Sequence, residues 1–118
     1  MVQIEQIAGA VLNGEGIVAR SLVQDFFREN PRLKNIPKPD VNDARLLTAC
    51  AALLELFASR LNQDAPKWTN NVEPLPEPIF LVGAAATMKR LRELCEKETP
   101  EPLRKRGFYA PPNYLEFA

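Results

Sequence analysis

Hydrophobic and polar residues recur with a helical period over much of this chain, and the longest uninterrupted pattern covers residues 40–62. Turned at about 100° per residue, the pattern gathers apolar side chains on one broad face. That face holds Leu46, Leu47, Cys50, Leu53, Leu54, Phe57 and Leu61, with Arg45, Thr48, Glu55, Ser59 and Asn62 opposite. Pro39 disfavours helix just before it, and Asp40 and Asp43 suit a helix start by capping and by charge. We therefore predict a central core helix.

Two shorter helical patterns precede it, over residues 2–12 and 17–30. Gly14 and Gly16 allow a turn between them, so residues 1–30 are predicted to form a helical hairpin. A DNA-reading helix-turn-helix is the sharper alternative. The second helix, however, balances its two arginines with acidic residues, which leaves little charge to contact phosphates. We interpret the hairpin as a packing pair.

Proline-rich connections flank the central helix, at residues 31–39 and 65–78. Leu33 and Ile36 are expected to attach the first connection to the core. The second is long for a loop in a compact domain, so it is either functional or tied down. We expect it to be tied down by Trp68, Val72 and Leu75.

Residues 79–98 form the third helical segment of this interpretation. Its first residues, 79–82, would also suit a short buried strand, but no second clear strand is available to pair with them. They are therefore interpreted as the start of a helix, with Pro78 at the first position. The expected apolar stripe comprises Ala84, Met88, Leu91, Leu94 and Cys95.

Residues 99–118 are predicted to form a short turn and a tail, with Thr99 as a cap, Pro100 as the first helical residue and Gly107 closing the turn. Together the patterns predict an all-α fold. It is a single domain, residues 1–118, built as a helical bundle of about four helices with proline-rich connections and an aromatic C-terminal tail.

Composition narrows the possible partners and the compartment. The 118 residues include 15 Lys plus Arg and 15 Asp plus Glu, so no overall field attracts nucleic acid or anionic lipid. The N-terminus lacks the cationic start of a secretory signal, and no apolar run is long enough for a membrane span. Cys50 and Cys95 suit reduced core positions. We expect a cytoplasmic protein without membrane association.

The chain has few groups suited to catalysis. It contains no histidine, which excludes Ser-His and Cys-His pairs, histidine metal ligands and the usual general base. Two distant cysteines cannot form a zinc site, and the two glycines of residues 13–20 do not match a phosphate-binding loop. Asp40 and Asp43 are explained by the helix start. We predict no catalytic residues, no cofactor, no metal and no enzymatic activity.

The tail is better suited to binding. Four aromatic side chains follow directly after the basic run 104–106, and interfaces favour this mixture of apolar area and charge. The hypothetical partner-binding residues are Trp68, Arg104, Lys105, Arg106, Phe108, Tyr109, Tyr114 and Phe117. The alternative is that the aromatic residues fold back as a terminal clamp on the core.

Three groups of residues in this chain occur in an order that is similar to the order in other proteins, and this similarity supports the partner-binding interpretation. They are Trp68-Thr69, the segment Pro76-Glu77-Pro78-Ile79-Phe80-Leu81, and Leu103-Arg104-x-Arg106-x-Phe108-Tyr109 followed by Asn113-x-Leu115. This order, within residues 40–118, resembles small uncharacterised bacterial proteins, some of them antitoxin-like and encoded beside a second protein. The resemblance implies a cytoplasmic bacterial protein that acts by occupying another protein, and it implies no catalytic residues.

We therefore expect a non-enzymatic interaction protein, antitoxin-like or otherwise regulatory, with a protein partner or a second copy of itself bound through the proline-rich loop and the tail. A nucleic-acid accessory protein is the alternative. It would use Arg90, Arg104, Lys105 and Arg106, with bases stacked on the neighbouring aromatic rings. An enzyme or ligand-binding protein that uses carboxylates and arginines in a helix-lined pocket is the third hypothesis.

Overall fold

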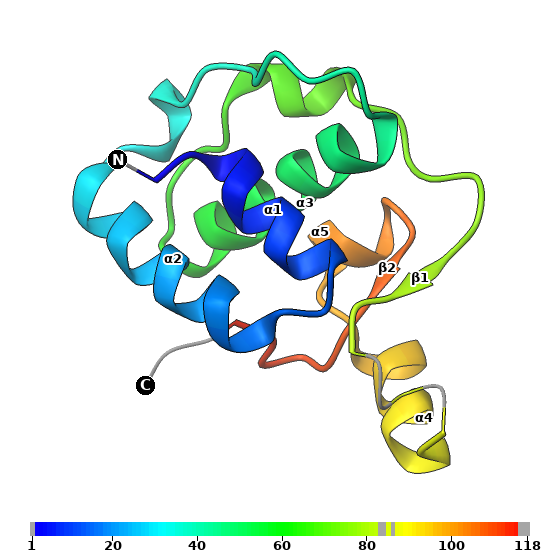
Figure 1. Ribbon diagram of the computed structural model, residues 1–118. Coiled ribbons are helices and arrows are strands. Elements are labelled where there is room, and N and C mark those ends of the chain that lie inside the picture. Colours follow the sequence, from blue (N-terminus) through cyan, green and yellow to red (C-terminus); the bar gives the residue numbers. More distant parts are fainter. Residues whose placement is uncertain (1, 83–84, 86, 116–118) are drawn as a thin grey trace.

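The computed structural model describes residues 2–82, 85 and 87–115, and over these residues the chain is mostly helical, as predicted (Figure 1). The helices are α1 (Ile4–Leu12), α2 (Gly16–Glu29), α3 (Ala44–Arg60), α4 (Lys89–Glu98) and α5 (Glu101–Arg104). Two short 3-10 helices, η1 (Leu33–Asn35) and η2 (Lys67–Asn71), lie in the connections, and the strands are β1 (Ile79–Phe80) and β2 (Phe108–Tyr109).

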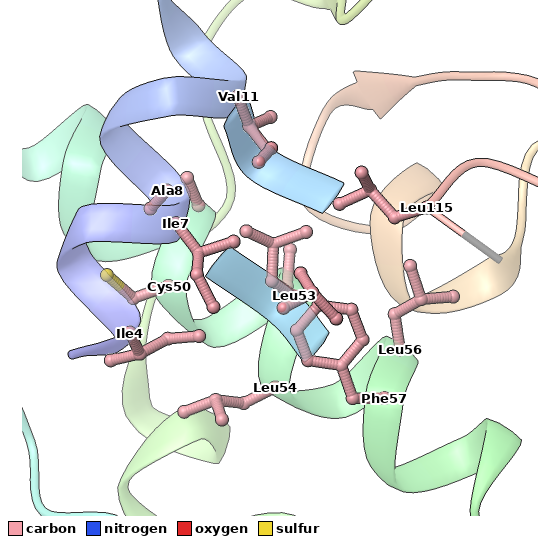
Figure 2. Close-up of a cluster of buried hydrophobic side chains, with 14 of the residues drawn as sticks. Ile4, Ile7, Ala8, Val11, Cys50, Leu53, Leu54, Leu56, Phe57 and Leu115 are labelled. Atoms are coloured by element: carbon pink, nitrogen blue, oxygen red, sulfur yellow. The ribbon is translucent and has the colours of Figure 1, made fainter. Parts of the chain in front are cut away.

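The core lies between α1 and α3, which pack against each other, while α2 packs on α1 (Figure 1). Figure 2 shows Ile4, Ile7 and Val11 of α1 pointing towards Leu53 and Phe57 of α3. All five side chains are buried, and burial of each such side chain stabilises the fold by roughly 1.5–3 kcal/mol. The predicted central helix is therefore confirmed as the main core element.

The central helix begins later than the sequence pattern suggested. It starts at Ala44 rather than near residue 40, and Asp43 is its cap. The Asp43 Oδ1 atom accepts hydrogen bonds from the backbone N–H groups of Arg45 at 2.9 Å and Leu46 at 3.4 Å. The prediction that Asp40 caps the helix was wrong, because Asp40 lies in the non-helical chain before the true first turn.

The polar face of α3 is also less exposed than its sequence suggested. Thr48 is buried, and its hydroxyl lies 3.2 Å from the Glu73 carbonyl oxygen in the proline-rich loop. The Glu55 side chain is only 12% exposed. The loop and the C-terminal tail cover this side of the helix, so α3 is enclosed through most of its length. Leu61, placed on the core face from sequence, is instead exposed at the helix end.

The interpretation of residues 79–98 as one helix was wrong. Ile79–Phe80 forms a strand that pairs in parallel with Phe108–Tyr109, so that Ile79 lies opposite Phe108. The pairing continues beyond the strands, because the Ile79 N–H donates to the Gly107 carbonyl at 2.8 Å and the Leu81 N–H donates to the Tyr109 carbonyl at 2.9 Å. The partner strand was not recognised because its two residues belong to the aromatic tail.

Helix α4 begins only at Lys89 and stands apart from the packed helices, at the lower right of Figure 1. It has few contacts with the other elements. The expected bundle of about four helices therefore does not include α4. Of its predicted apolar stripe, Met88 is exposed, Cys95 is buried, and Ala84 lies outside the described residues. The Arg92 guanidinium lies 5.3 Å from the centre of the Phe80 ring, which links α4 to β1.

Thr99 ends α4 rather than capping the next helix. Its hydroxyl donates to the Cys95 carbonyl and accepts from the Ala110 N–H at 3.2 Å. Pro100 is the residue before α5, so the expected helix start is displaced by one position. Thr99 thus ties the end of α4 to the tail.

The connection at residues 31–39 is attached to the core as predicted, since Leu33 is buried and Ile36 packs against the core. The Gln63 side chain holds it further, because its Oε1 accepts from the Leu33 N–H at 3.0 Å and its Nε2 donates to the Pro31 carbonyl at 3.1 Å. Among the described helices, none has the length and apolar character needed to cross a lipid bilayer.

The two aspartates at the start of α3 provide a matched test of the helix boundary. Asp43→Ala is expected to lower the free energy of unfolding by about 1 kcal/mol, because two backbone N–H groups lose their acceptor. Asp40→Ala removes the same charge and is expected to leave stability almost unchanged. Urea unfolding of both variants measures the difference, and equal losses would contradict the assignment of Asp43 as the cap.

Candidate functional site

A cluster of charges holds the tail on α3. Arg106 Nη1 lies 2.5 Å from Glu55 Oε1, and Lys105 Nζ lies 2.9 Å from Glu55 Oε2. Arg106 is 4% exposed, whereas the Lys105 side chain is 44% exposed. A buried charge without a partner is very costly, so Glu55 and Arg106 depend on each other. Lys105 contributes less because water screens it.

Arg106 also joins the tail to the proline-rich loop. Its Nη2 atom donates to the Thr69 carbonyl in η2, and its own carbonyl accepts from the Leu75 N–H at 3.0 Å. Gly107 follows with a φ of +92°, and a Cβ there would lie 3.2 Å from the Leu75 Cβ. The chain therefore needs glycine at this turn to bring the tail against the loop.

The tail continues along the core after β2. Tyr109 stacks on Phe80, with ring centres 5.4 Å apart, and Leu115 is buried beside α1 and α3 (Figure 2). Arg60 Nη2 donates to the Pro112 carbonyl at 3.3 Å, which fixes the tail to the end of α3. The backbone of residues 106–115 thus follows the body of the molecule.

The eight predicted partner-binding residues separate into four groups. Arg104 and Lys105 are exposed, while Trp68, Tyr109 and Tyr114 are half-buried. Arg106 and Phe108 are buried at 4% and 1% exposure, so in this fold they contact the protein's own core. Phe117 lies outside the described residues. The clamp alternative, which concerned the aromatic residues, therefore accounts for Phe108, and Arg106 is buried as well. Only the first two groups face solvent.

A groove of about 710 Å³ lies beside Trp68, between the connection that contains η1 and the segment that contains η2. Its lining residues are Lys34, Asn35, Asp64, Ala65, Pro66, Lys67, Trp68, Thr69 and Asn70. The Trp68 Nε1 donates to the Ile36 carbonyl at 2.9 Å, which joins the two walls. A smaller hollow of about 210 Å³ shares Lys34 and Asp64 with the groove and adds Arg32. The groove volume falls in the range typical of ligand sites.

The charges that line the groove are not used by the fold. Lys34, Lys67 and Asp64 are exposed, and none has an ion-pair partner among the residues that the structure describes. Lys34 comes from the η1 wall and Lys67 from the η2 wall. These charged groups are therefore available to a ligand.

Sequence reasoning identified Trp68 but missed the rest of the groove and the importance of Glu55. Lys34, Asp64 and Lys67 occur singly in connections, so no local pattern marks them. Glu55 occupies a position on α3 where a polar residue is expected to face water. The sequence held one indirect signal for Glu55. The basic run 104–106 and the proline-rich loop both had to pack on some part of the core, and an acidic residue there could pair with the basic run.

Two titratable side chains, those of Cys50 and Tyr114, have raised pKa values. Burial raises the pKa of the Cys50 thiol from 9.0 to about 12, with a smaller contribution from the charge of Glu5. Burial also raises the pKa of Tyr114 to about 12. Within the described part of the chain, no group of three or more His, Cys, Asp or Glu side chains is arranged to hold a metal ion. A thiol with such a raised pKa is a poor nucleophile near neutral pH.

Comparison of this chain with protein-family models, with curated proteins and with solved structures gives no match.

The buried pair is expected to dominate the stability of the tail. Arg106→Ala should lower the free energy of unfolding by about 3 kcal/mol, because it leaves Glu55 buried without its main partner. Lys105→Ala, at the neighbouring position, should cost less than about 1 kcal/mol. Chemical denaturation followed by circular dichroism measures both. A similar cost for the two variants would contradict the unequal roles assigned to Arg106 and Lys105.

The raised pKa of Cys50 predicts a specific pH dependence. Above pH 9 the unfolded chain loses the thiol proton while the folded chain keeps it, so stability falls as pH rises from 9 towards about 12. The expected slope is about 1 kcal/mol per pH unit. Cys50→Ala removes this term, so the stability difference between the two proteins should shrink as pH passes 9. Parallel pH profiles from urea unfolding would contradict the assignment.

Proposed function

We propose that this protein is a small non-enzymatic interaction protein, antitoxin-like or otherwise regulatory, that binds a partner protein. The binding surface comprises the proline-rich loop, residues 65–78, and the exposed part of the tail. This loop–tail surface includes Arg104, Lys105, Tyr109 and Tyr114 from the tail and Trp68 from the loop. The resemblance to small bacterial proteins, some of them antitoxin-like, implies the same mode of action.

The observation that supports the proposal most strongly is the anchoring of the tail beside the loop. Arg106 bonds both Glu55 of α3 and the Thr69 carbonyl of η2, and the Leu75 N–H bonds the Arg106 carbonyl. The loop and the tail, which are 37 residues apart at Thr69 and Arg106, are thereby held in a fixed relation. A surface that is ordered before binding loses less conformational entropy when a partner docks, which favours affinity.

The chemistry of the exposed groups also favours protein binding. Within the tail, Arg104 and Lys105 supply exposed positive charge and Tyr109 and Tyr114 supply half-buried aromatic rings, while the loop supplies exposed prolines. Arginine and tyrosine are enriched in protein interfaces because they combine apolar area with hydrogen-bond donors. By contrast, burial of Arg106 removes one of the four cations that a nucleic-acid interface would use.

The proposal is tested on the full chain purified at native abundance from its host, by size-exclusion chromatography with native mass spectrometry. The wild-type protein should elute in a stoichiometric complex with another protein. Arg104→Glu should weaken that complex about fivefold, because it reverses one charge at the surface. Elution of the wild-type chain alone as a monomer would contradict the proposal.

Lys89→Glu is the matched control. It makes the same change of charge at an exposed position on α4, outside the loop–tail surface, where a negative charge suits the helix N-terminus. It should leave the complex intact, and circular dichroism should show that both variants are folded. Removal of the whole tail is a poor test, because it would delete the buried side chains of Phe108 and Leu115.

A further inference from the structure

The groove beside Trp68 has a defined shape and unused charges. One wall comes from Lys34 and Asn35 in the connection that contains η1, and the other comes from residues 64–70. Gln63 bonds the first wall at Leu33 and Pro31, and the Trp68 Nε1 bonds it at Ile36. Both walls are therefore fixed by hydrogen bonds before anything binds, which reduces the entropic cost of binding.

Positive charge faces the groove from both sides. Lys34 lies on the first wall and Lys67 on the second, and Arg32 lies in the adjoining hollow. The structure describes no ion-pair partner for any of the three. Asp64 is the one acidic residue among the lining residues of the groove and the hollow. A ligand with negative charges spaced along its length would complement this arrangement.

The remaining lining groups distinguish a peptide from a nucleic acid. The side-chain amides of Asn35 and Asn70 can both donate and accept hydrogen bonds, as a peptide backbone requires. Asp64 can accept a hydrogen bond from a peptide N–H, a donor that the sugar-phosphate backbone of DNA does not offer. The half-buried Trp68 ring adds an apolar contact for a side chain.

We infer that the groove between η1 and η2 binds an extended, acidic peptide segment of the partner protein, with Lys34 and Lys67 paired to its carboxylates and Trp68 packed against its chain. This inference rests on the proposed function, because it identifies the kind of segment that the partner supplies. It extends the loop–tail surface from Trp68 across the groove to Lys34 and Asn35.

The single tryptophan makes the test direct, since Trp68 lies in the groove and its fluorescence reports occupancy. The probe is a short peptide of alternating glutamate and glycine, titrated into the full-length protein at low salt. Its binding should shift the Trp68 emission and should weaken as salt is added. The matching peptide of glutamine and glycine should produce no shift, and an equal response to both peptides would overturn the charge argument.

Charge reversal locates the site. Lys34→Glu/Lys67→Glu should weaken binding of the acidic peptide about tenfold or more. Lys89→Glu/Arg90→Glu makes the same change of net charge on α4, away from the groove, and should bind as the wild type does. Thermal unfolding verifies that both variants are folded. Equal affinities of the two double variants would overturn the inference, and so would tighter binding of a single-stranded oligothymidylate than of the peptide.

The native complex separates this inference from the proposed function. If the wild type forms a complex and Lys34→Glu/Lys67→Glu weakens it as the peptide data require, the groove is supported. If the complex forms equally well with that variant, the groove inference fails and the proposed function stands. If the wild-type chain forms no complex, the proposed function fails, whatever the peptide titration shows.

Discussion

The fold of the C-terminal half depends on one buried charge pair. Glu55 lies in the middle of α3, and Arg106 Nη1 lies 2.5 Å from its Oε1 atom. Neither charge is stable alone in such a position, because removal from water costs several kcal/mol for each ion. The same guanidinium bonds the Thr69 carbonyl, so the pair fixes the tail and the proline-rich loop together. Strand pairing of Ile79 with Phe108 and the turn at Gly107 then follow from the position of Arg106.

This arrangement buries one part of the tail in the core and leaves another part at the surface. The side chains of Arg106 and Phe108 close the core, whereas Arg104 and Lys105 remain at the surface. Burial of Arg106 and Phe108 orders the backbone of the tail. Arg104 and Lys105 are therefore held in a defined position at the surface. The groove beside Trp68 is also formed by ordered connections, because hydrogen bonds from Gln63 and Trp68 hold its walls in place. The charged side chains on those walls form no ion pairs among the described residues. Order in the connections thus supports the proposed protein-binding function, because an ordered surface loses less conformational entropy on binding.

The sequence was sufficient for features that depend on local periodicity. The helices up to residue 60, the buried Leu33 and the reduced, buried cysteines follow from apolar spacing and capping residues. It was insufficient where a segment depends on a distant partner. Ile79–Phe80 became a strand because Phe108–Tyr109 lies beside it, and Glu55 became buried because Arg106 covers it. A local sequence pattern cannot predict these contacts, because the paired residues are brought together only when the long segments between them fold.

Hydrogen exchange of the backbone amides in Glu55→Gln tests most directly whether the buried pair holds the tail and the loop in place. The amides of Leu75, Ile79 and Leu81 donate to carbonyls of residues 106–109, so they report whether the tail is docked. We expect their protection to fall sharply in the variant, while amides of the α1–α3 core stay protected because they open only on global unfolding. Unchanged protection of the three amides would contradict the account.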